Sequence, residues 1–258
     1  MAIRWGKQAS EWSAVTQAET EGFDFVQPVG ALIADLGAKQ FQAQRSQAPP
    51  GGLPFTACDV PLPAEARVTQ RGFNLYAWAE YLKTATPRLF ELGCRKLLWS
   101  NGRARLLPPE GDVTDLKEQT LQFLFMLCEI AGSFQITVLV EPLGPRRTNY
   151  LNSMREVEDL LARVGKENLS SMISLRELES VDLPFARLED HQRLIRHVHM
   201  ENPRVQEGPG TCPRPSDGYD YRRFLHVLKG FGYSGEIGLP SDADADGLAY
   251  CREQWEQA

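Results

Sequence analysis

The stretch QITVLVEP (residues 135–142) combines an almost unbroken apolar run with a carboxylate at its end. β-Branched residues dominate positions 136–140, which predicts a strand buried on both faces, as in parallel sheets. Glu141 follows this run directly. A carboxylate in such surroundings costs several kcal/mol to desolvate unless a positive group meets it. We therefore expect Glu141 to serve a function at the end of its strand.

The same pattern repeats on both sides of this strand, because short apolar runs alternate with longer amphipathic segments. We expect the other strands at residues 2–7, 23–30, 54–60, 94–101, 169–177, 194–202 and 235–242. Residues 74–92, 114–132 and 149–165 show helical spacing, and the Gln- and Pro-rich residues 40–52 are expected to form an exposed loop. Eight strands with helical crossovers predict one α/β domain over residues 1–258, a single (β/α)8 TIM barrel.

The composition is that of an ordinary globular protein, with 42% hydrophobic and 24% charged residues. The formal net charge of −6 argues against a nucleic-acid surface, and the longest apolar runs are strand-sized. Neither nucleic acid nor a membrane is therefore an expected partner. The opening MAIRWGKQASEW lacks the apolar core of a signal peptide, which favours a cytoplasmic location.

The cysteines show no CxxC pair and no zinc-ligand spacing. Buried free thiols are the favoured interpretation, with a disulfide or metal role as the alternative. The five are Cys58, Cys94, Cys128, Cys212 and Cys251.

In parallel barrels the active site gathers at the C-terminal ends of the strands. This rule selects Asn101, Gly102, Arg103, Arg105, Glu141, Ser174, Arg176, Glu177, His197, His199, Glu201, Asn202, Pro240, Ser241 and Asp242. His197 and His199 lie two residues apart on one strand, so both side chains face the same side. A metal or catalytic role is the favoured interpretation of this pair, and hydrogen-bonded core histidines are the alternative.

Four segments carry recognisable motifs in order along the chain. They are LGCRKLLWSNGRARLLPPEGD (92–112), VEPLGPRRTNYLNS (140–153), HVHMEN (197–202) and DYRRFLHVLKGFGYSGEIGL (220–239). They resemble a strand ending in GSGxAR, the segment EPLNRYETNFLN, the motif HxHxxD/E, and the closing helix and strand of one family. That family is the xylose-isomerase-like TIM barrels, which include sugar and sugar-phosphate isomerases and epimerases. The resemblance runs from about residue 54 to about residue 240.

In that family a divalent metal, commonly Mn²⁺, Mg²⁺ or Co²⁺, is held by Glu, Asp, His and Glu from strands five to eight. Carboxylates then move a proton between neighbouring carbons. By this resemblance Glu141 and His199 match two of the four ligands, while Ser174 and Pro240 occupy the other two positions. Because Ser offers a neutral oxygen and Pro only its carbonyl, the resemblance implies a metal site that is weak or absent.

Two further family positions differ in this chain. The substrate-contacting His of the family's DxxH motif is replaced by Glu177, and a Glu that often belongs to the acid/base pair is replaced by Arg147. With Arg176, these changes add positive charge near Glu141. We expect a guanidinium to pair with Glu141 where the metal would lie, and the cavity to favour an anionic ligand. Further arginines stand at neighbouring strand ends, namely Arg103, Arg105 and Arg204.

Alternatives remain for both the arginines and the metal. Any one of the arginines could be a solvated loop residue. Glu177 could join Glu141 and His199 as a third ligand, or Asp242 could turn back from its loop to replace the missing carboxylate. Either arrangement would rebuild a metal site in altered geometry.

The resemblance implies an isomerase or epimerase with Glu141, His199 and Glu177 as catalytic residues. The expected substrate-binding residues are Asn101, Arg105, Arg147, Arg176, His197 and Arg204. The alternative is a non-catalytic relative that binds an anionic sugar derivative or serves as a partner subunit. The DNA-repair endonuclease branch of these barrels needs many His and acidic ligands, and four histidines with a net charge of −6 argue against it. Family members are often dimers or tetramers, so a homodimer or homotetramer is expected.

Overall fold

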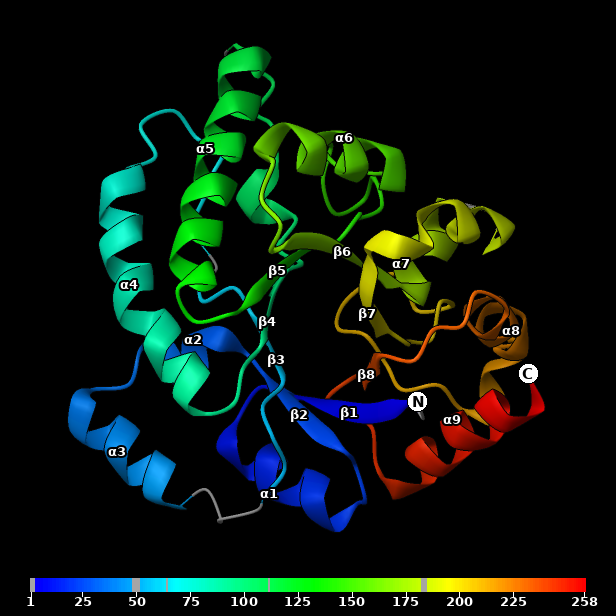
Figure 1. The fold of residues 1–258 in the computed structure, drawn as a ribbon. Helices are drawn as coiled ribbons and strands as arrows, with labels where there is room; N and C mark the ends of the chain where they lie inside the picture. The colour runs from blue at the N-terminus through cyan, green and yellow to red at the C-terminus, as the bar shows by residue number, and fades with distance from the viewer. Residues whose placement is uncertain (1–2, 48–51, 64, 111, 182–184) are drawn as a thin grey trace.

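The structure of the protein is a computed structural model that describes residues 3–47, 52–63, 65–110, 112–181 and 185–258. A parallel sheet runs through it in the order β2-β1-β8-β7-β6-β5-β4-β3, surrounded by helices (Figure 1). The Val26 N–H donates to the Pro54 carbonyl at 3.1 Å and joins the two edges, so the sheet forms a nearly closed (β/α)8 TIM barrel, as expected. The strands are β1 (Arg4–Ala9), β2 (Phe25–Pro28), β3 (Ala57–Asp59), β4 (Lys96–Trp99), β5 (Thr137–Val140), β6 (Leu169–Ser174), β7 (Ile195–His199) and β8 (Glu236–Leu239).

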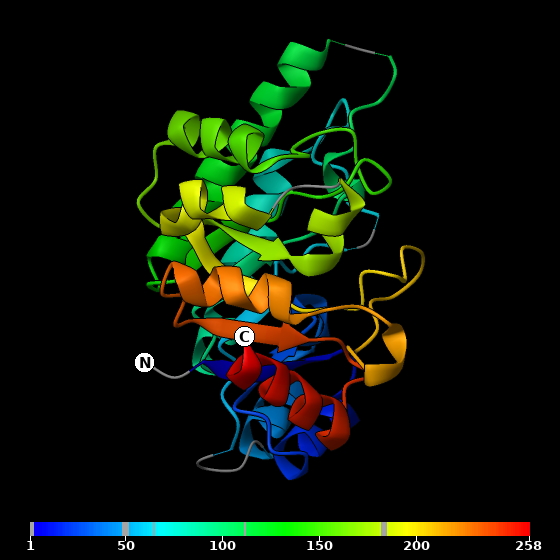
Figure 2. The ribbon, with the colours of Figure 1, turned by 90° about the vertical axis from the view of Figure 1, so that its right-hand side faces the viewer.

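Helices lie along the outer surface of the barrel (Figures 1 and 2). They are α1 (Trp12–Thr20), α2 (Gly30–Ala34), α3 (Ala38–Gln47), α4 (Leu75–Glu91), α5 (Val113–Gly132), α6 (Met154–Val164), α7 (Leu175–Ser180), α8 (Arg222–Gly230) and α9 (Ala245–Gln257), with 3-10 segments η1 (Arg103–Arg105), η2 (Phe185–Leu194) and η3 (Pro215–Asp217). Helix α6 has favourable capping residues at both ends. The Ser153 hydroxyl accepts from the Glu156 N–H at its start, and Gly165 ends it with φ of 66°. No helix in the described ranges is long and apolar enough to cross a membrane.

Two sequence-based expectations about secondary structure are wrong. The expected loop 40–52 is largely helix α3, in which Phe41 is the buried apolar anchor among polar residues. A single anchor gives no helical periodicity to detect. Positions 48–51 of that expected loop lie outside the described residues. The expected strand 169–177 ends at Ser174, and Arg176 and Glu177 belong to helix α7.

The main hydrophobic core lies between the strands and the helices. Strand residues such as Leu97, Val138 and Val198 point outward into this core and meet helix residues such as Leu127 and Leu160. All five cysteines are free thiols that are buried in the same core. The interpretation as buried free thiols is therefore confirmed.

The interior of the barrel is divided into an apolar half and a polar half. Strands β3 to β6 contribute a separate buried cluster, which consists of Ala57, Leu98, Leu139 and Met172. On the opposite side, the Phe25 ring fills the space beside Gly6, where a Cβ would stand 2.1 Å from its Cε2 atom. The same ring meets His197 edge-on at a centroid distance of 6.1 Å. The polar side chains of the barrel interior therefore come mainly from β1, β2, β7 and β8.

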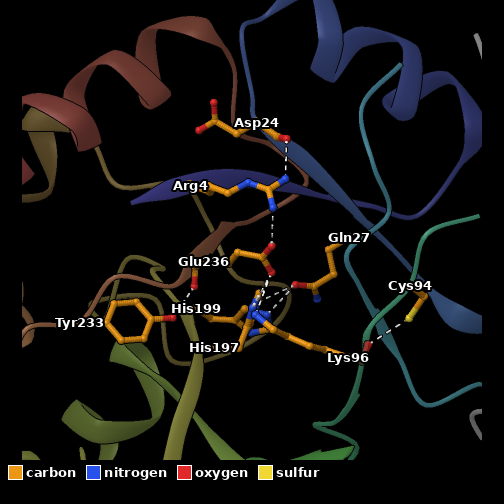
Figure 3. A network of polar contacts seen from close by, with 9 residues as sticks. All are labelled: Arg4, Asp24, Gln27, Cys94, Lys96, His197, His199, Tyr233 and Glu236. Atoms are coloured by element: carbon orange, nitrogen blue, oxygen red, sulfur yellow. Dashed lines mark hydrogen bonds and ion pairs between the residues drawn. The ribbon is translucent and has the colours of Figure 1, made fainter. Parts of the chain in front are cut away.

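Glu236 carries the negative charge of this polar half. Its side chain is 8% exposed and pairs with Arg4 at 3.1 Å and with Lys96 at 3.0 Å (Figure 3). Burial raises the pKa of Glu236, but the contacts with His197 and Lys96 outweigh burial and lower it to about 2. Because the strands begin here, at the end of the barrel opposite the C-terminal mouth, this cluster serves stability.

The acid sensitivity of folding tests this role of Glu236. A lowered carboxyl pKa contributes stability that is present above the unfolded value of 4.5 and is lost as pH falls toward about 2. We expect Glu236→Gln to lower the free energy of unfolding at pH 7 by about 3 kcal/mol, since a pKa lowered from 4.5 to about 2 corresponds to roughly that energy. Urea denaturation between pH 7 and pH 3 measures both effects.

The matched control for this substitution is Glu118→Gln. Glu118 pairs with Arg163 at 3.2 Å, but its side chain is 53% exposed. Solvent weakens such a pair, so we expect a loss below about 1 kcal/mol. Equal losses in the two variants would contradict a structural role for the buried cluster.

Candidate functional site

A cavity of about 860 Å³ opens at the C-terminal ends of the strands. Its described lining is almost entirely polar, since prolines and glycines are the remaining members. The lining residues are Gln8, Asp59, Ser100, Glu141, Arg146, Arg147, Ser174, Arg176, Glu177, His199, Glu201, Gln206, Glu207, Gly208, Pro209, Gly210, Pro240 and Ser241. A large concave polar site at this face is the default binding site of a parallel barrel.

Glu141 lies at the cavity wall just after β5 and is 3% exposed. Burial, followed by the negative charges of Glu177 and Glu201, raises its pKa well above the usual value, although Arg147 and Arg105 oppose the rise. The ion pairs of the described residues do not include Glu141. The expected direct pair between a guanidinium and Glu141 is therefore wrong, because Arg147 and Arg176 pair with other carboxylates.

Arg147 is held by Glu177 instead. Its Nη1 lies 3.3 Å from Glu177 Oε1, while Glu177 Oε2 accepts from the Gly144 N–H at 2.7 Å. A Cβ at Gly144 would stand 2.1 Å from Ser180 Oγ, so the close approach requires glycine. Both oxygens of Glu177 are thus engaged, and the carboxylate is fixed at the cavity wall.

Arg176 is held by Glu201 and by the loop after β7. Its Nη1 lies 3.5 Å from Glu201 Oε2, and its Nη2 donates to the Gly208 carbonyl at 2.9 Å. Gly210 leaves room for the Glu201 carboxylate, because a Cβ there would stand 2.3 Å from Oε2. Arg176 therefore fastens the loop 206–210, which forms one wall of the cavity, to the end of β6.

Arg105 is fully buried behind the strand end. Its Nη2 donates to the Glu141 backbone carbonyl, and its guanidinium carbon lies 5.4 Å from the centroid of the Trp99 ring. Burial lowers the pKa of Arg105 to about 10, and its Nε and Nη1 atoms find no hydrogen-bond partner among the described residues. Arg105 supports the backbone of Glu141 and is not among the described cavity-lining residues.

Several other sequence-selected residues also lie outside the described cavity lining. Asn101 accepts from the Ala104 N–H at 3.2 Å, and Arg204 reaches the Gly218 carbonyl at 3.5 Å. His197 is 0% exposed and lies inside the barrel. The Asp242 carboxylate accepts from the Cys212 N–H at 2.9 Å, so it is engaged by the loop after β7. The remaining members of this group are Gly102, Arg103 and Asn202.

His199 and Ser174 both face the cavity from neighbouring strands. His199 Nε2 lies 3.0 Å from the side-chain amide of Gln27, and burial lowers the pKa of His199 well below the usual value, so the ring is neutral. Ser174 is 2% exposed, and its hydroxyl is a buried oxygen without a partner in the described ranges. A hydroxyl left without a partner at a cavity wall is available to a ligand.

Sequence reasoning missed the first three strands of the site. Gln8 lies on β1, Gln27 on β2 and Asp59 on β3. Gln8 and Asp59 line the cavity directly. Asp59 is the last residue of β3 and the next-to-last residue of the expected strand 54–60, so the strand-end rule that selected Glu141 could have found it. Burial raises the pKa of Asp59 to about 6, although a hydrogen bond from Ser100 lowers it.

The family of this chain is shown by its match to a model of a known protein family. A family model described as xylose isomerase-like TIM barrel matches residues 15–254. The chain belongs to this family. The resemblance drawn from the sequence motifs is confirmed.

Solved structures share the xylose isomerase-like barrel at low sequence identity. A D-psicose 3-epimerase determined with D-fructose has a TM-score of 0.80 and 14% identity, over 98% of this chain and 99% of that chain. A 3-keto-D-glucoside 4-epimerase from E. coli has a TM-score of 0.77 and 17% identity, over 97% and 99%. An AP endonuclease of family 2 from Brucella melitensis has a TM-score of 0.69 and 18% identity, over 97% and 98%. No curated protein matches the sequence. These likenesses show the fold, and the function has to be argued from the site.

The residues of this xylose isomerase-like barrel do not fit the divalent metal that the resemblance implies. No three His, Cys, Asp or Glu side chains gather into a metal-binding group anywhere in the described ranges. Ser174 and Pro240 line the cavity at the two altered positions. Glu177 and Asp242, the two substitutes considered, both have their carboxylates engaged by other groups. Mn²⁺, Mg²⁺ and Co²⁺ need more oxygen ligands than this arrangement supplies.

The amount of divalent metal that the protein retains tests whether these residues can hold an ion. We expect protein that has been incubated with Mn²⁺, Mg²⁺ or Co²⁺ and then desalted to retain far less than one ion per chain by elemental analysis. The Glu141→Ala and His199→Ala variants should retain the same small amount. A stoichiometric ion that both substitutions remove would contradict the interpretation.

Asp59 gives the barrel a second pH dependence, opposite in sign to that of Glu236. A raised carboxyl pKa contributes stability that is present below the unfolded value of 3.8 and is lost as pH rises through about 6. We expect Asp59→Asn to raise the free energy of unfolding at pH 7 by about 1 to 3 kcal/mol and to leave it unchanged near pH 3. Denaturation curves at pH 3, 5 and 7 test this, and a loss of stability at pH 7 would contradict it.

Proposed function

We propose that this barrel is an isomerase or epimerase of a neutral sugar, with Glu141 as the group that transfers the proton. The supporting observation is a buried carboxylate at the wall of a polar cavity that makes no ion pair in the described structure and has a raised pKa. Such a carboxyl is suited to accept and return a proton near neutral pH. Membership of the family is consistent with this chemistry.

The balance of charge in the cavity supports a neutral substrate over an anionic one. The described lining contains five carboxylates, those of Asp59, Glu141, Glu177, Glu201 and Glu207, and three guanidiniums, those of Arg146, Arg147 and Arg176. Two of the guanidiniums already neutralise Glu177 and Glu201. An anion entering the cavity would therefore meet a surplus of negative charge. This balance of charge favours a neutral sugar over the anionic ligand expected from the arginines.

The chemistry proposed for Glu141 is proton transfer beside a carbonyl. The Glu141 carboxylate takes the proton from the carbon next to the sugar carbonyl, and the electrons of that C–H bond move into an enediolate. Return of that proton to the neighbouring carbon, with one proton shifted between the two sugar oxygens, gives the isomer. Delivery of a proton to the opposite face by a second acid gives the epimer, and Asp59 and Glu207 are the candidates for this acid among the described lining carboxyls. The Ser174 hydroxyl, which has no described partner, is placed to bind a sugar hydroxyl, while Glu177 and Glu201 stay fixed by their arginines.

A non-catalytic sugar-binding protein is the second candidate. The observation in its favour is that Glu177 has both oxygens engaged, so a second free carboxylate beside Glu141 is not supplied from that position. Asp59 and Glu207 make no described ion pair and line the same cavity. The two candidates differ in whether a bound sugar exchanges its carbon-bound proton with solvent.

Exchange with deuterated water tests the proposed reaction. Neutral ketoses, with D-fructose, D-psicose, D-tagatose and L-ribulose as the first panel, are incubated with the protein in ²H₂O and followed by ¹H NMR. We expect one sugar to lose the signal of the proton beside its carbonyl and to form a new epimer or isomer. Glu141→Gln should slow this exchange by about 10²–10⁴-fold, the usual contribution of a general acid or base.

The control for this experiment is again Glu118→Gln, because that carboxylate is exposed on α5 and lies outside the cavity lining. It should keep the exchange rate of the unmodified protein. Binding of a sugar, seen by calorimetry, without exchange would favour the non-catalytic candidate. Exchange that survives Glu141→Gln would remove Glu141 from its proposed role.

A further inference from the structure

Two imidazoles on β7 share one side-chain amide inside the barrel. Gln27 Oε1 lies 3.1 Å from His197 Nε2 and 3.0 Å from His199 Nε2 (Figure 3). Gly238 on β8 makes room for the contact, because a Cβ there would stand 3.1 Å from both the Gln27 amide and His199 Cδ2. The side chains of Gln27, His197 and His199 are buried, so no bulk water competes for these hydrogen bonds.

A shared amide end forces the two rings into the same tautomer. If the Gln27 end that faces the rings is the carbonyl oxygen, it accepts from both, and both rings carry their proton on Nε2. If the amide is turned over so that its NH₂ group faces the rings, its two hydrogens serve one Nε2 each. Both rings then carry their proton on Nδ1. A mixed state would leave one of the two contacts without a hydrogen.

Glu236 decides between the two arrangements. Its carboxylate is ionised by its pairs with Arg4 and Lys96, and Oε2 lies 3.8 Å from His197 Nδ1. His197 Nδ1 is buried and has no hydrogen-bond partner among the described residues. A bare nitrogen lone pair directed at a buried carboxylate is repelled, whereas an N–H there is attracted. The charge of Glu236 therefore favours the proton on His197 Nδ1.

The tautomer of His197 determines the tautomer of His199, which lines the cavity. We propose that Gln27 donates a hydrogen bond to each Nε2 atom and thereby fixes His199 with its proton on Nδ1. The Nε2 and Cδ2 edge of the His199 ring faces Gln27 and Gly238, so the opposite edge carries Nδ1. His199 lines the cavity, and Nδ1 makes no hydrogen bond to a described residue. The ring presents an N–H donor to the cavity.

An N–H donor at this place has a chemical use. A neutral imidazole can donate to a carbonyl oxygen and stabilise the charge that develops on it when a neighbouring C–H bond breaks. In the proposed reaction, on which this assignment of use rests, His199 would bind the sugar carbonyl while Glu141 takes the proton. A protonated Nδ1 also has no lone pair to give to a metal, which agrees with the poor ligand set. Gln27 is then a positioning residue that acts through His199.

Nitrogen NMR of the histidine rings tests the tautomer without any ligand. The chain has four histidines, and the spectrum of protein labelled with ¹⁵N-histidine is assigned with His191→Gln and His226→Gln variants. We expect long-range ¹H–¹⁵N correlations at neutral pH to show His197 and His199 both protonated on Nδ1 and bare on Nε2. Protonation of either ring on Nε2, on both nitrogens, or on a time average of the two positions would overturn the proposal.

Gln27→Leu separates positioning from simple packing. His197 should keep its proton on Nδ1 through Glu236, while His199 should lose its single tautomer and show a mixture. The matched control is Gln8→Leu, since Gln8 pairs in register with Gln27 on the neighbouring strand and makes no described contact with either ring. It should leave both tautomers unchanged. An unchanged His199 in Gln27→Leu would overturn the role of Gln27.

The outcome is independent of the sugar experiment. The histidine tautomers are measured in the ligand-free protein. If none of the sugars reacts, the tautomer result still stands, but the proposed role of His199 in binding a sugar carbonyl is lost. If His199 carries its proton on Nε2 in a protein that does exchange the sugar proton, the tautomer proposal is wrong and the proposed reaction still stands.

Discussion

The buried charge of Glu236 is the constraint on which the polar half of the barrel depends. A carboxylate that is 8% exposed must be surrounded by cations or donors, and Arg4, Lys96 and His197 supply them. Gly6 and Gly238 then have to be small, because the Phe25 ring and the Gln27 amide fill the space beside them. The orientation of His199 at the other end of the barrel follows from this packing. The charge of Glu236 at the base of the strands thus influences the wall of the cavity through the side chains of His197, Gln27 and His199.

Two of the carboxylates that line the cavity are paired with arginines, and this pairing organises its walls. Glu177 and Glu201 are each neutralised by an arginine and serve to hold the walls in place. Glu141 is left without such a partner among the described residues, and desolvation rather than attraction governs its pKa. A carboxyl of that kind is the least stabilising member of the site and the most reactive toward protons. The proposed function rests on this contrast between paired and unpaired carboxylates.

The fold and the strand-end residues could be predicted from the sequence because both follow from periodicity. Apolar runs such as residues 136–140 and the position of Glu141 after them are local signals. The salt-bridge partners of Arg147 and Arg176 could not be predicted, because they depend on side-chain direction and on Arg176 lying in a helix. The role of Gln27 could not be predicted for a similar reason. Nothing in the local sequence of a short strand indicates that its polar residue will contact a histidine ring 170 positions later.

Ser174 and Pro240, which stand where the family resemblance implies two carboxylates, are consistent with the charges around them. Aspartate at position 174 and glutamate at position 240 would add two carboxylates to a cavity that already contains five. Without a divalent cation, that many negative charges in partly desolvated surroundings would repel each other strongly and raise one another's pKa. Serine and proline avoid that added repulsion, and Arg147 and Arg176 neutralise two of the five carboxylates that remain. A neutral N–H donor such as His199 is compatible with this site, because it polarises an oxygen without needing any counter-charge around it.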